Sequence, residues 1–404
     1  MCINNNVNSS ALKHNSESIR GVSLGGWLVL EPWITPSLFE LALNITKSVL
    51  VDEYTLCLQL GPEAQPLLSS HWASFITKSD IASISSMGFN MIRVPIGYWA
   101  IQKQAGDPYV AGQLKYLDKA IEWCKEYGLK VQIDLHGMPG SQNGFDNSGQ
   151  RTSPPLWLQN DDSFQISVNV LRFVFAKYSL QPFRETIHSI EVVNEPFGPI
   201  LGRSKIEEFY QLASEMSQTY DIPIFVHDAF LGIDAWAGFQ DTTPTQVTVD
   251  HHFYSIFSQA QIEWDRELHF QNVIKLGNML AQSENSKVVG EFSGALTDCA
   301  PYLNGVGLGH RFDGTLQQTI PIGTCSNYKD IAKWASEDIV NTLKFIYLQI
   351  QVYERSCGGW IFWTYKTEGA WEWDYTKLVA IGLLPSTINQ IINDNQVLKD
   401  LYHP

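Results

Sequence analysis

Short apolar runs recur along the chain and alternate with longer stretches in which apolar residues return every three or four positions. Runs of this kind, rich in β-branched and aromatic residues, are typical of strands. We predict eight strands, at residues 21–28, 90–97, 130–137, 189–196, 222–230, 246–254, 286–293 and 358–365.

The stretches between these runs have helical spacing. Leu117, Ile121 and Cys124, for example, fall on one helical face within residues 113–128. Further helices are predicted at 164–180, 204–220, 265–283 and 334–356, and another after a predicted N-cap at Ser79.

Strand and helix therefore alternate around eight strands, which favours a closed (β/α)8 TIM barrel over an open doubly wound sheet. An open sheet should carry a Gly-rich phosphate turn after its first strand, whereas GGWLVLEPW stands there. We predict a flexible segment at residues 1–20 and one barrel catalytic domain at 21–404, with loop insertions at its C-terminal face.

Polar or aromatic residues lie at or near the end of each predicted strand, where a structural strand has no need of them. Because the C-terminal strand ends of such a barrel form one face, we expect these side chains to converge on one pocket. They are Glu31, Arg93, His136, Asn194, Glu195, Asp228, His252, Tyr254, Glu291 and Trp363.

Two of these residues are carboxylates that follow apolar strands without an obvious cationic partner, Glu195 and Glu291. Two buried carboxylates that face each other keep one protonated while the other stays charged. Glycoside hydrolysis needs this asymmetry, because an acid protonates the departing oxygen while a carboxylate attacks the anomeric carbon or activates water. Asn194 is suited to holding a sugar hydroxyl, since an amide both donates and accepts.

His252 and Tyr254 alternate with Phe253, so both should face the barrel mouth while His251 points away. Tyr254 is placed to donate to the nucleophile. Trp363 is either a floor on which a sugar ring stacks or a filler of the core.

Composition narrows the substrate. A formal net charge of −15 disfavours nucleic acids and anionic membranes as partners, and 49 aromatic residues (13 Trp, 16 Tyr, 20 Phe) suit neutral sugars as well as cores. No run reaches the about 18 apolar residues of a membrane span. The first 20 residues carry no signal-peptide pattern, so we expect a cytoplasmic protein, or alternatively a secreted or cell-wall protein exported by an unrecognised route. We also expect a monomer.

Several longer motifs resemble one family, the fungal exo-1,3-β-glucanases of glycoside hydrolase family five. The resemblance spans residues 21 to about 385, nearly the whole chain. The matching stretches are GVSLGGWLVLEPWITPSLFE, IRVPIGYWA, DLHGMPGSQNGFDNSG, NEPFGP, VDHHFYSIF, GEFSGALTDCAPYLNGVGLG and GGWIFWTYKTEGA.

The resemblance implies a retaining enzyme of cell-wall glucan metabolism, with Glu195 as acid/base and Glu291 as nucleophile, that needs neither metal nor cofactor. It implies a subsite for the terminal glucose formed by Glu31, Arg93, His136, Asn194, His252, Tyr254 and Trp363. It also implies an entrance at Phe145 and Phe257, with Phe230 and Asp146 nearby, and a disulfide between Cys299 and Cys325. The sequence departs from the family in three aromatic exchanges, at Trp33, Tyr365 and Phe292, which bear on substrate fit.

Three alternatives stay open at this point. The same barrel can carry an endo-acting or 1,4-linked glycanase, because the catalytic pair does not specify linkage. A carbohydrate-binding protein without activity is a second reading. A metal hydrolase using His136, His251 and His252 is a third, although adjacent histidines on a strand point to opposite faces and make a poor ligand set.

Overall fold

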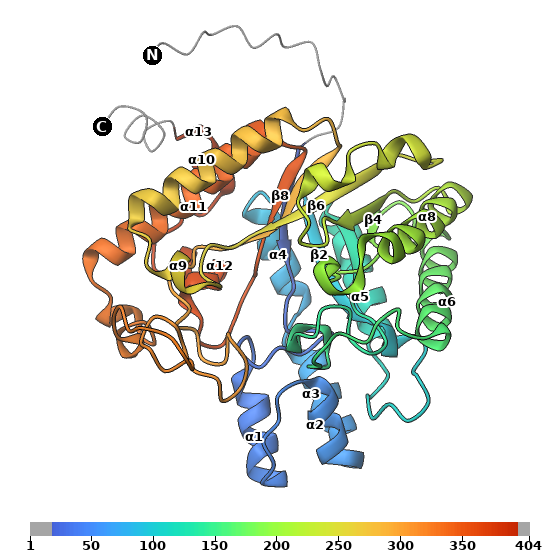
Figure 1. Cartoon of the computed structure of the whole chain (residues 1–404), viewed down its shortest axis with the longest axis horizontal. Coiled ribbons are helices and arrows are strands. Elements are labelled where there is room, and N and C mark those ends of the chain that lie inside the picture. The colour runs from blue at the N-terminus through green and yellow to red at the C-terminus, as the bar shows by residue number, and fades with distance from the viewer. Residues whose placement is uncertain (1–17, 395–404) are drawn as a thin grey trace, which may run out of the picture.

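Eight parallel strands close into a barrel in chain order, with β1 paired to both β2 and β8 (Figure 1). The computed structural model describes residues 18–394. The strands are β1 (Ile19–Ser23), β2 (Met91–Gly97), β3 (Lys130–Gly137), β4 (Ile187–Glu191), β5 (Ile224–His227), β6 (Val247–Phe253), β7 (Lys287–Phe292) and β8 (Gly359–Phe362). The predicted (β/α)8 barrel is confirmed, and each strand overlaps its predicted run.

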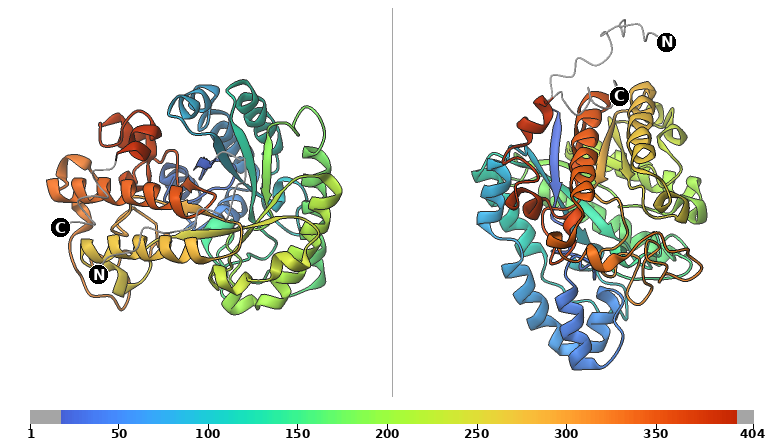
Figure 2. Two further views of the ribbon diagram at one scale, coloured as in Figure 1. Left: turned by 90° about the horizontal axis from the view of Figure 1, so that it is seen from above. Right: turned by 90° about the vertical axis from the view of Figure 1, so that its left-hand side faces the viewer.

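Helices surround the strands on the outside, as the view from above shows (Figure 2). The long helices that were predicted are α4 (Lys78–Ser86), α5 (Leu114–Glu126), α6 (Asp161–Tyr178), α8 (Arg203–Tyr220), α10 (Arg266–Gln282) and α11 (Ser336–Ser356). Shorter helices are α7 (Gly198–Leu201), α9 (Gln259–Ile262), α12 (Tyr375–Ala380) and α13 (Ile388–Asn393). Single 3-10 turns occur at Gly61–Glu63, Tyr98–Ala100, Asp146–Ser148, Ile233–Trp236, Phe239–Thr242, Cys325–Asn327, Ile331–Lys333 and Trp371–Trp373.

Several predicted boundaries are wrong; β4, for example, ends at Glu191 and not at residue 196. The N-cap of α4 is Thr77 and not Ser79, because the side chain of Asp80 accepts the backbone N–H of Thr77 at 2.8 Å and completes a capping box. Strand β1 begins at Ile19, inside the segment predicted to be flexible, and ends at Ser23, because residues 24–35 form turns and bends. Residues 1–17 of that segment lie outside the described residues.

Three helices between β1 and β2 were not predicted: α1 (Pro36–Thr46), α2 (Glu53–Leu60) and α3 (Ala64–Ser74). Helices α1 and α2 extend away from the barrel at the bottom of Figure 1. Buried Glu53 anchors them, since one carboxylate oxygen accepts the N–H of Leu30 at 2.9 Å and the other accepts Nε1–H of Trp99 at 3.0 Å. The insertion therefore supports the turn that carries Glu31.

Trp99 is itself tightly enclosed. Its ring stacks on Tyr109 with centroids 4.1 Å apart, and a Cβ at Gly97 or Gly137 would come within 2.5 Å of the indole. Only glycine therefore leaves room at these two strand ends, and the fixed indole presents its N–H to Glu53.

The long connection after β7 contains the one disulfide of the described residues, Cys299–Cys325, which agrees with the pairing that the resemblance implied. Cys57, Cys124 and Cys357 are free thiols. Among residues 18–394, no helix is both long and apolar enough to cross a bilayer.

We expect Glu53→Ala to lower the free energy of unfolding by about 2 kcal/mol, because two buried N–H donors lose their acceptor. Burial raises the pKa of Glu53 to about 8, although both hydrogen bonds oppose this. A carboxyl whose folded pKa is raised stabilises the fold fully below its unfolded pKa, and this contribution is lost as the pH rises through 8. Urea unfolding should therefore show a larger loss at pH 5 than at pH 8.

The matched control is Glu63→Ala, at an exposed glutamate of the same insertion, which should change the unfolding midpoint little. Equal midpoints for the two variants would show that Glu53 does not anchor the insertion.

Candidate active site

The two predicted catalytic carboxylates lie close together at the barrel mouth. Glu195 follows β4 and Glu291 lies in β7, and both are buried, with exposed fractions of 6% and 5%. Nδ1 of His252 lies 2.8 Å from Oε1 of Glu195 and 3.4 Å from Oε2 of Glu291. These two oxygens are therefore separated by no more than the sum of the two distances, 6.2 Å.

Glu291 is held by a cation and a hydroxyl. Nη1 of Arg93 lies 2.6 Å from Oε1, and the hydroxyl of Tyr254 donates to Oε2 at 2.9 Å. Tyr254 thus makes the hydrogen bond to Glu291 that was expected of it. The expectation that Glu291 has no cationic partner is wrong, because Arg93 is that partner. Arg93 and Glu291 are 198 residues apart, so local spacing carried no sign of the pair. Burial raises the pKa of Glu291, and the charges of His252 and Arg93 oppose it.

Glu195 has two partners, His252 at Oε1 and the amide of Asn147, which donates to Oε2 at 3.1 Å. Asn147 was missed by the sequence reasoning, although it lies in the quoted stretch GFDNSG. Burial alone would raise the pKa of Glu195, but the hydrogen bond and charge of His252 outweigh it and lower the pKa to about 2.

The proton of the site therefore lies on His252. Burial would lower the pKa of its imidazole, but the charges of Glu291 and Asp250 raise it well above the usual value. This direction differs from the expectation that the acid keeps its own proton, because the sequence did not show that a buried imidazole would lie between the carboxylates.

Five buried polar atoms of the predicted glucose subsite have no hydrogen-bond partner within the protein. Two of them, Nε of Arg93 and Nε2 of His252, belong to side chains that contact the catalytic carboxylates, and the other three are Oε1 of Glu31, Nε2 of His136 and Nδ2 of Asn194. A buried polar group without a partner is unfavourable, so these three atoms are suited to a ligand with many hydroxyls.

In Glu31, His136 and Asn194, the second polar atom of the side chain already has a partner in the protein. Trp33 donates to Glu31 at 2.8 Å, Asp134 binds His136 at 2.7 Å, and Arg93 donates to Oδ1 of Asn194 at 2.8 Å. Asn194 consequently offers its unpartnered N–H2 donor, whereas its oxygen, which was also expected to accept from a sugar, already accepts from Arg93.

Trp363 is buried at 3% exposure, with the ring of His136 stacked parallel to it at 5.4 Å and the Arg93 guanidinium 5.7 Å away. Trp373 was missed: its ring packs between Trp33 and Tyr254, and its buried Nε1 has no partner. The aromatic wall of the site is therefore larger than the sequence suggested.

The predicted entrance residues are exposed aromatic rings. Phe145 and Phe230 lie edge to face at 6.4 Å, and Phe257 contacts Tyr254 at 5.7 Å. Phe145, Phe230 and Phe257 have exposed fractions of 43%, 41% and 42%. Asp146 follows Phe145, and burial, together with the charge of Asp52, raises its pKa to about 7.

Of the three aromatic departures from the family, only Trp33 contacts a residue of the predicted glucose subsite, namely Glu31. Phe292 packs in the core against Phe362 at 5.3 Å, and the hydroxyl of Tyr365 donates to the backbone of Asp80. The exchange at Phe292 therefore affects packing in the core, and the exchange at Tyr365 affects a contact with α4.

The adjacent histidines bind different partners, as expected: His251 pairs with Asp228 at 2.7 Å, and His252 with Glu195. The side chain of Asp228 also accepts the N–H of Phe230 at 3.0 Å, so its two hydrogen bonds are to residues other than the catalytic pair. The disfavoured metal-binding alternative of His136, His251 and His252 is not among the close groups of ligand atoms in the described residues, whereas ligand atoms of Glu195, His227 and His252 lie within 4.8 Å of one another. Nδ1 of His227 accepts the N–H of Ala229, so Nε2 carries the proton and is a poor metal ligand.

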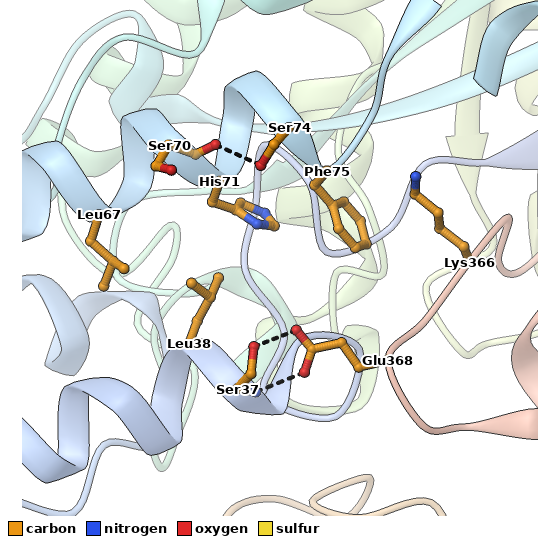
Figure 3. Close-up of a pocket in the computed structure, with 9 residues that line it drawn as sticks. All are labelled: Ser37, Leu38, Leu67, Ser70, His71, Ser74, Phe75, Lys366 and Glu368. Carbon is orange, nitrogen blue, oxygen red and sulfur yellow. Dashed lines mark hydrogen bonds between the residues drawn. The ribbon is translucent and has the colours of Figure 1, made fainter. Parts of the chain in front are cut away.

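A separate pocket of about 360 Å³ lies between α1, α3 and the loop after β8 (Figure 3). Its charged groups bind neighbours in the protein, Glu368 to Ser37 and Lys366 to Asp80. None of the nine lining residues belongs to the ring around Glu195 and Glu291.

Comparison with known proteins agrees with this geometry. Residues 60–304 match the family described as "Cellulase (glycosyl hydrolase family 5)". A "Glucan 1,3-beta-glucosidase" of Lachancea kluyveri is 42% identical, with 95% of this chain and 90% of the relative covered. The chain belongs to glycosyl hydrolase family 5.

Other relatives of this family 5 chain have similar names. "Glucan 1,3-beta-glucosidase I/II" of Saccharomyces cerevisiae is 42% identical over 94% of this chain and 88% of the relative. Among solved structures, rutinosidase from Aspergillus niger superposes with a TM-score of 0.71 at 20% identity, covering 91% and 97% of the two chains, which supports the fold alone.

We expect Tyr254→Phe to lower kcat/KM about 10- to 100-fold, because a hydrogen bond to a charged carboxylate is lost. Losing the donor raises the pKa of Glu291, so the acidic limb of the pH profile of kcat/KM should move to higher pH. Tyr178→Phe is the control, since it removes a similar bond, 3.0 Å long, to Asp118 on the outer helices. A limb that stays in place would contradict this role of Tyr254.

Proposed function

We propose that this family 5 protein is an exo-acting glucan 1,3-β-glucosidase that releases terminal glucose with retention of configuration. The geometric observation that carries retention is the single imidazole nitrogen within 3.4 Å of both carboxylates. It limits the nearest carboxylate oxygens to 6.2 Å, below the about 6.5–9.5 Å of inverting enzymes, which must fit a water between the groups. The predicted spacing of about 5–5.5 Å lies within this limit.

In the first half of the reaction, Glu291 attacks the anomeric carbon while Glu195 protonates the departing glycosidic oxygen. Arg93 and Tyr254 hold the two oxygens of Glu291 and so orient the attacking carboxylate. In the second half, Glu195 accepts a proton from water, which displaces Glu291 from the sugar. Interception of the intermediate by a sugar hydroxyl gives transglucosylation.

The terminal glucose is assigned to the ring of Glu31, Arg93, His136, Asn194, His252, Tyr254 and Trp363. The unpartnered atoms of Glu31, His136 and Asn194 are the donors and acceptors available to its hydroxyls. Phe145, Phe230 and Phe257, which are exposed, are assigned to the next glucose unit, since sugar faces stack on aromatic rings. The 1,3 linkage and the exo mode rest on the names of the relatives.

Linkage and mode of attack are tested by measuring glucose release from laminarin, from laminarin blocked at its non-reducing ends, and from a 1,4-glucan. We expect rapid release from the first and very little from the other two. Cleavage of the blocked polymer would indicate an endo-acting enzyme, and activity on the 1,4-glucan a different linkage.

Retention and the nucleophile are tested together. NMR of the anomeric proton should show β-glucose as the first product, with longer oligosaccharides at high substrate concentration, and an initial α-product would exclude the double displacement. Glu291→Gln should lower kcat at least about 1000-fold while the protein still binds glucan. Glu284→Gln, at an exposed glutamate, is the control. A wild type as inactive as Glu291→Gln, with binding intact, would indicate a carbohydrate-binding protein instead.

A further inference from the structure

Asp250 lies beneath the catalytic pair, in β6, and is completely buried. One carboxylate oxygen accepts, at 2.6 Å, the N–H of Gly290, the residue that directly precedes Glu291 in the chain. The other oxygen faces Nε2 of His252 at 3.6 Å. A Cβ on Gly290 would lie 2.0 Å from this second oxygen, so the glycine provides the space that the carboxylate occupies.

Resting on the double displacement proposed above, we propose that Asp250 is a positioning residue for that reaction. Its charge keeps the Nε2–H of His252 directed at itself, so that Nδ1 of the same ring always faces Glu195 and exchanges a proton with it. A carboxylate behind an imidazole fixes the tautomer in the same way in other acid–base sites.

The groups around His252 support a single mobile proton. The ring faces Glu195 from the end of β4, His227 from β5, Asp250 from β6 and Glu291 from β7. His227 stays neutral, because burial and the charge of His252 lower its pKa to about 4. Of the two neighbouring histidines, His252 is therefore the one that carries a positive charge.

Asp250 stays charged although it is buried. Burial would raise its pKa, but the charges of His252 and Arg93 lower it. Burial, followed by the charge of Asp250, raises the pKa of Glu191 well above its usual value.

The proton balance follows from these positions. When Glu291 bonds to the anomeric carbon, it loses the negative charge that lay 3.4 Å from Nδ1, and the imidazolium holds its proton less strongly. The proton crosses the 2.8 Å hydrogen bond to Glu195 and passes to the glycosidic oxygen, which keeps the electron pair of the broken C–O bond. In the second half, Glu195 takes a proton from water and returns it to Nδ1, while Glu291 leaves with its charge restored.

Asp250→Asn tests this role, because the amide oxygen can still accept from Gly290 while the charge facing His252 is lost. We expect kcat/KM on laminaribiose, whose leaving oxygen needs a proton, to fall about 100-fold. On 2,4-dinitrophenyl β-glucoside, whose leaving group needs none, kcat/KM should be nearly unchanged. Asp118→Asn, which removes a salt bridge to Lys177 on the outer helices, is the matched control.

An equal loss on both substrates would mean that Asp250 only holds the backbone next to Glu291, and no loss would mean that it plays no part; either result overturns the proposal. Wild-type enzyme inactive on both substrates would instead refute the proposed function.

A second measurement on the wild type decides the matter if the variant does not fold. Nitrogen NMR of His252 should show Nε2 protonated both in the free enzyme and after Glu291 is trapped with a 2-deoxy-2-fluoroglucosyl fluoride. Nδ1 should be protonated in the free enzyme and deprotonated after trapping. An Nε2 without a proton in either state, or an Nδ1 that keeps its proton after trapping, overturns the proposal.

Discussion

The buried guanidinium of Arg93 is the charge on which the mouth of the barrel depends. It is fully excluded from solvent and contacts Glu291 at 2.6 Å, Asn194 at 2.8 Å and Asp134 at 3.2 Å. A buried cation is unfavourable unless it is paired and hydrogen bonded, and here partners from β3, from the segment after β4 and from β7 bind its two terminal nitrogens, while Nε has no partner within the protein. Contacts with this one charge, which lies on β2, therefore connect side chains from four strands at the mouth.

The pairing extends outward from this cation. Asp134, which contacts Arg93, also binds Nδ1 of His136, and this leaves Nε2 of the same ring directed at the site. Arg93 occupies the oxygen of Asn194, and this leaves its amide N–H2. The protein thus satisfies one half of each polar side chain and leaves the other half for a ligand, which is how a rigid site achieves affinity for hydroxyl groups without flexible arms.

The helices outside the barrel contribute to the same site through backbone position. Glu53 of α2 accepts the N–H of Leu30 and the indole N–H of Trp99. Leu30 directly precedes Glu31, and Oε2 of Glu31 accepts the indole N–H of Trp33. Glycines 97 and 137 leave room for that indole at the ends of β2 and β3. The insertion between β1 and β2 therefore supports the position of Glu31, a residue of the predicted glucose subsite.

The sequence by itself determined the eight strands, the barrel and the identity of most residues at its mouth. These follow from local signals, namely hydrophobic period, chain-order alternation and a polar residue after each apolar run, and the family motifs added the 1,3 linkage. Boundaries were less accurate, because capping of α4 depends on Asp80, three residues beyond Thr77. Helices α2 and α3 have weak apolar periodicity of their own. The pairs that set the chemistry were decided only by the tertiary structure, because Arg93 and Glu291 are 198 residues apart, and Asp250, His252 and Glu195 meet only where β4 and β6 end at one face. The direction of each pKa depends on burial and on charges brought together by barrel closure, and no local spacing in the chain contains that information.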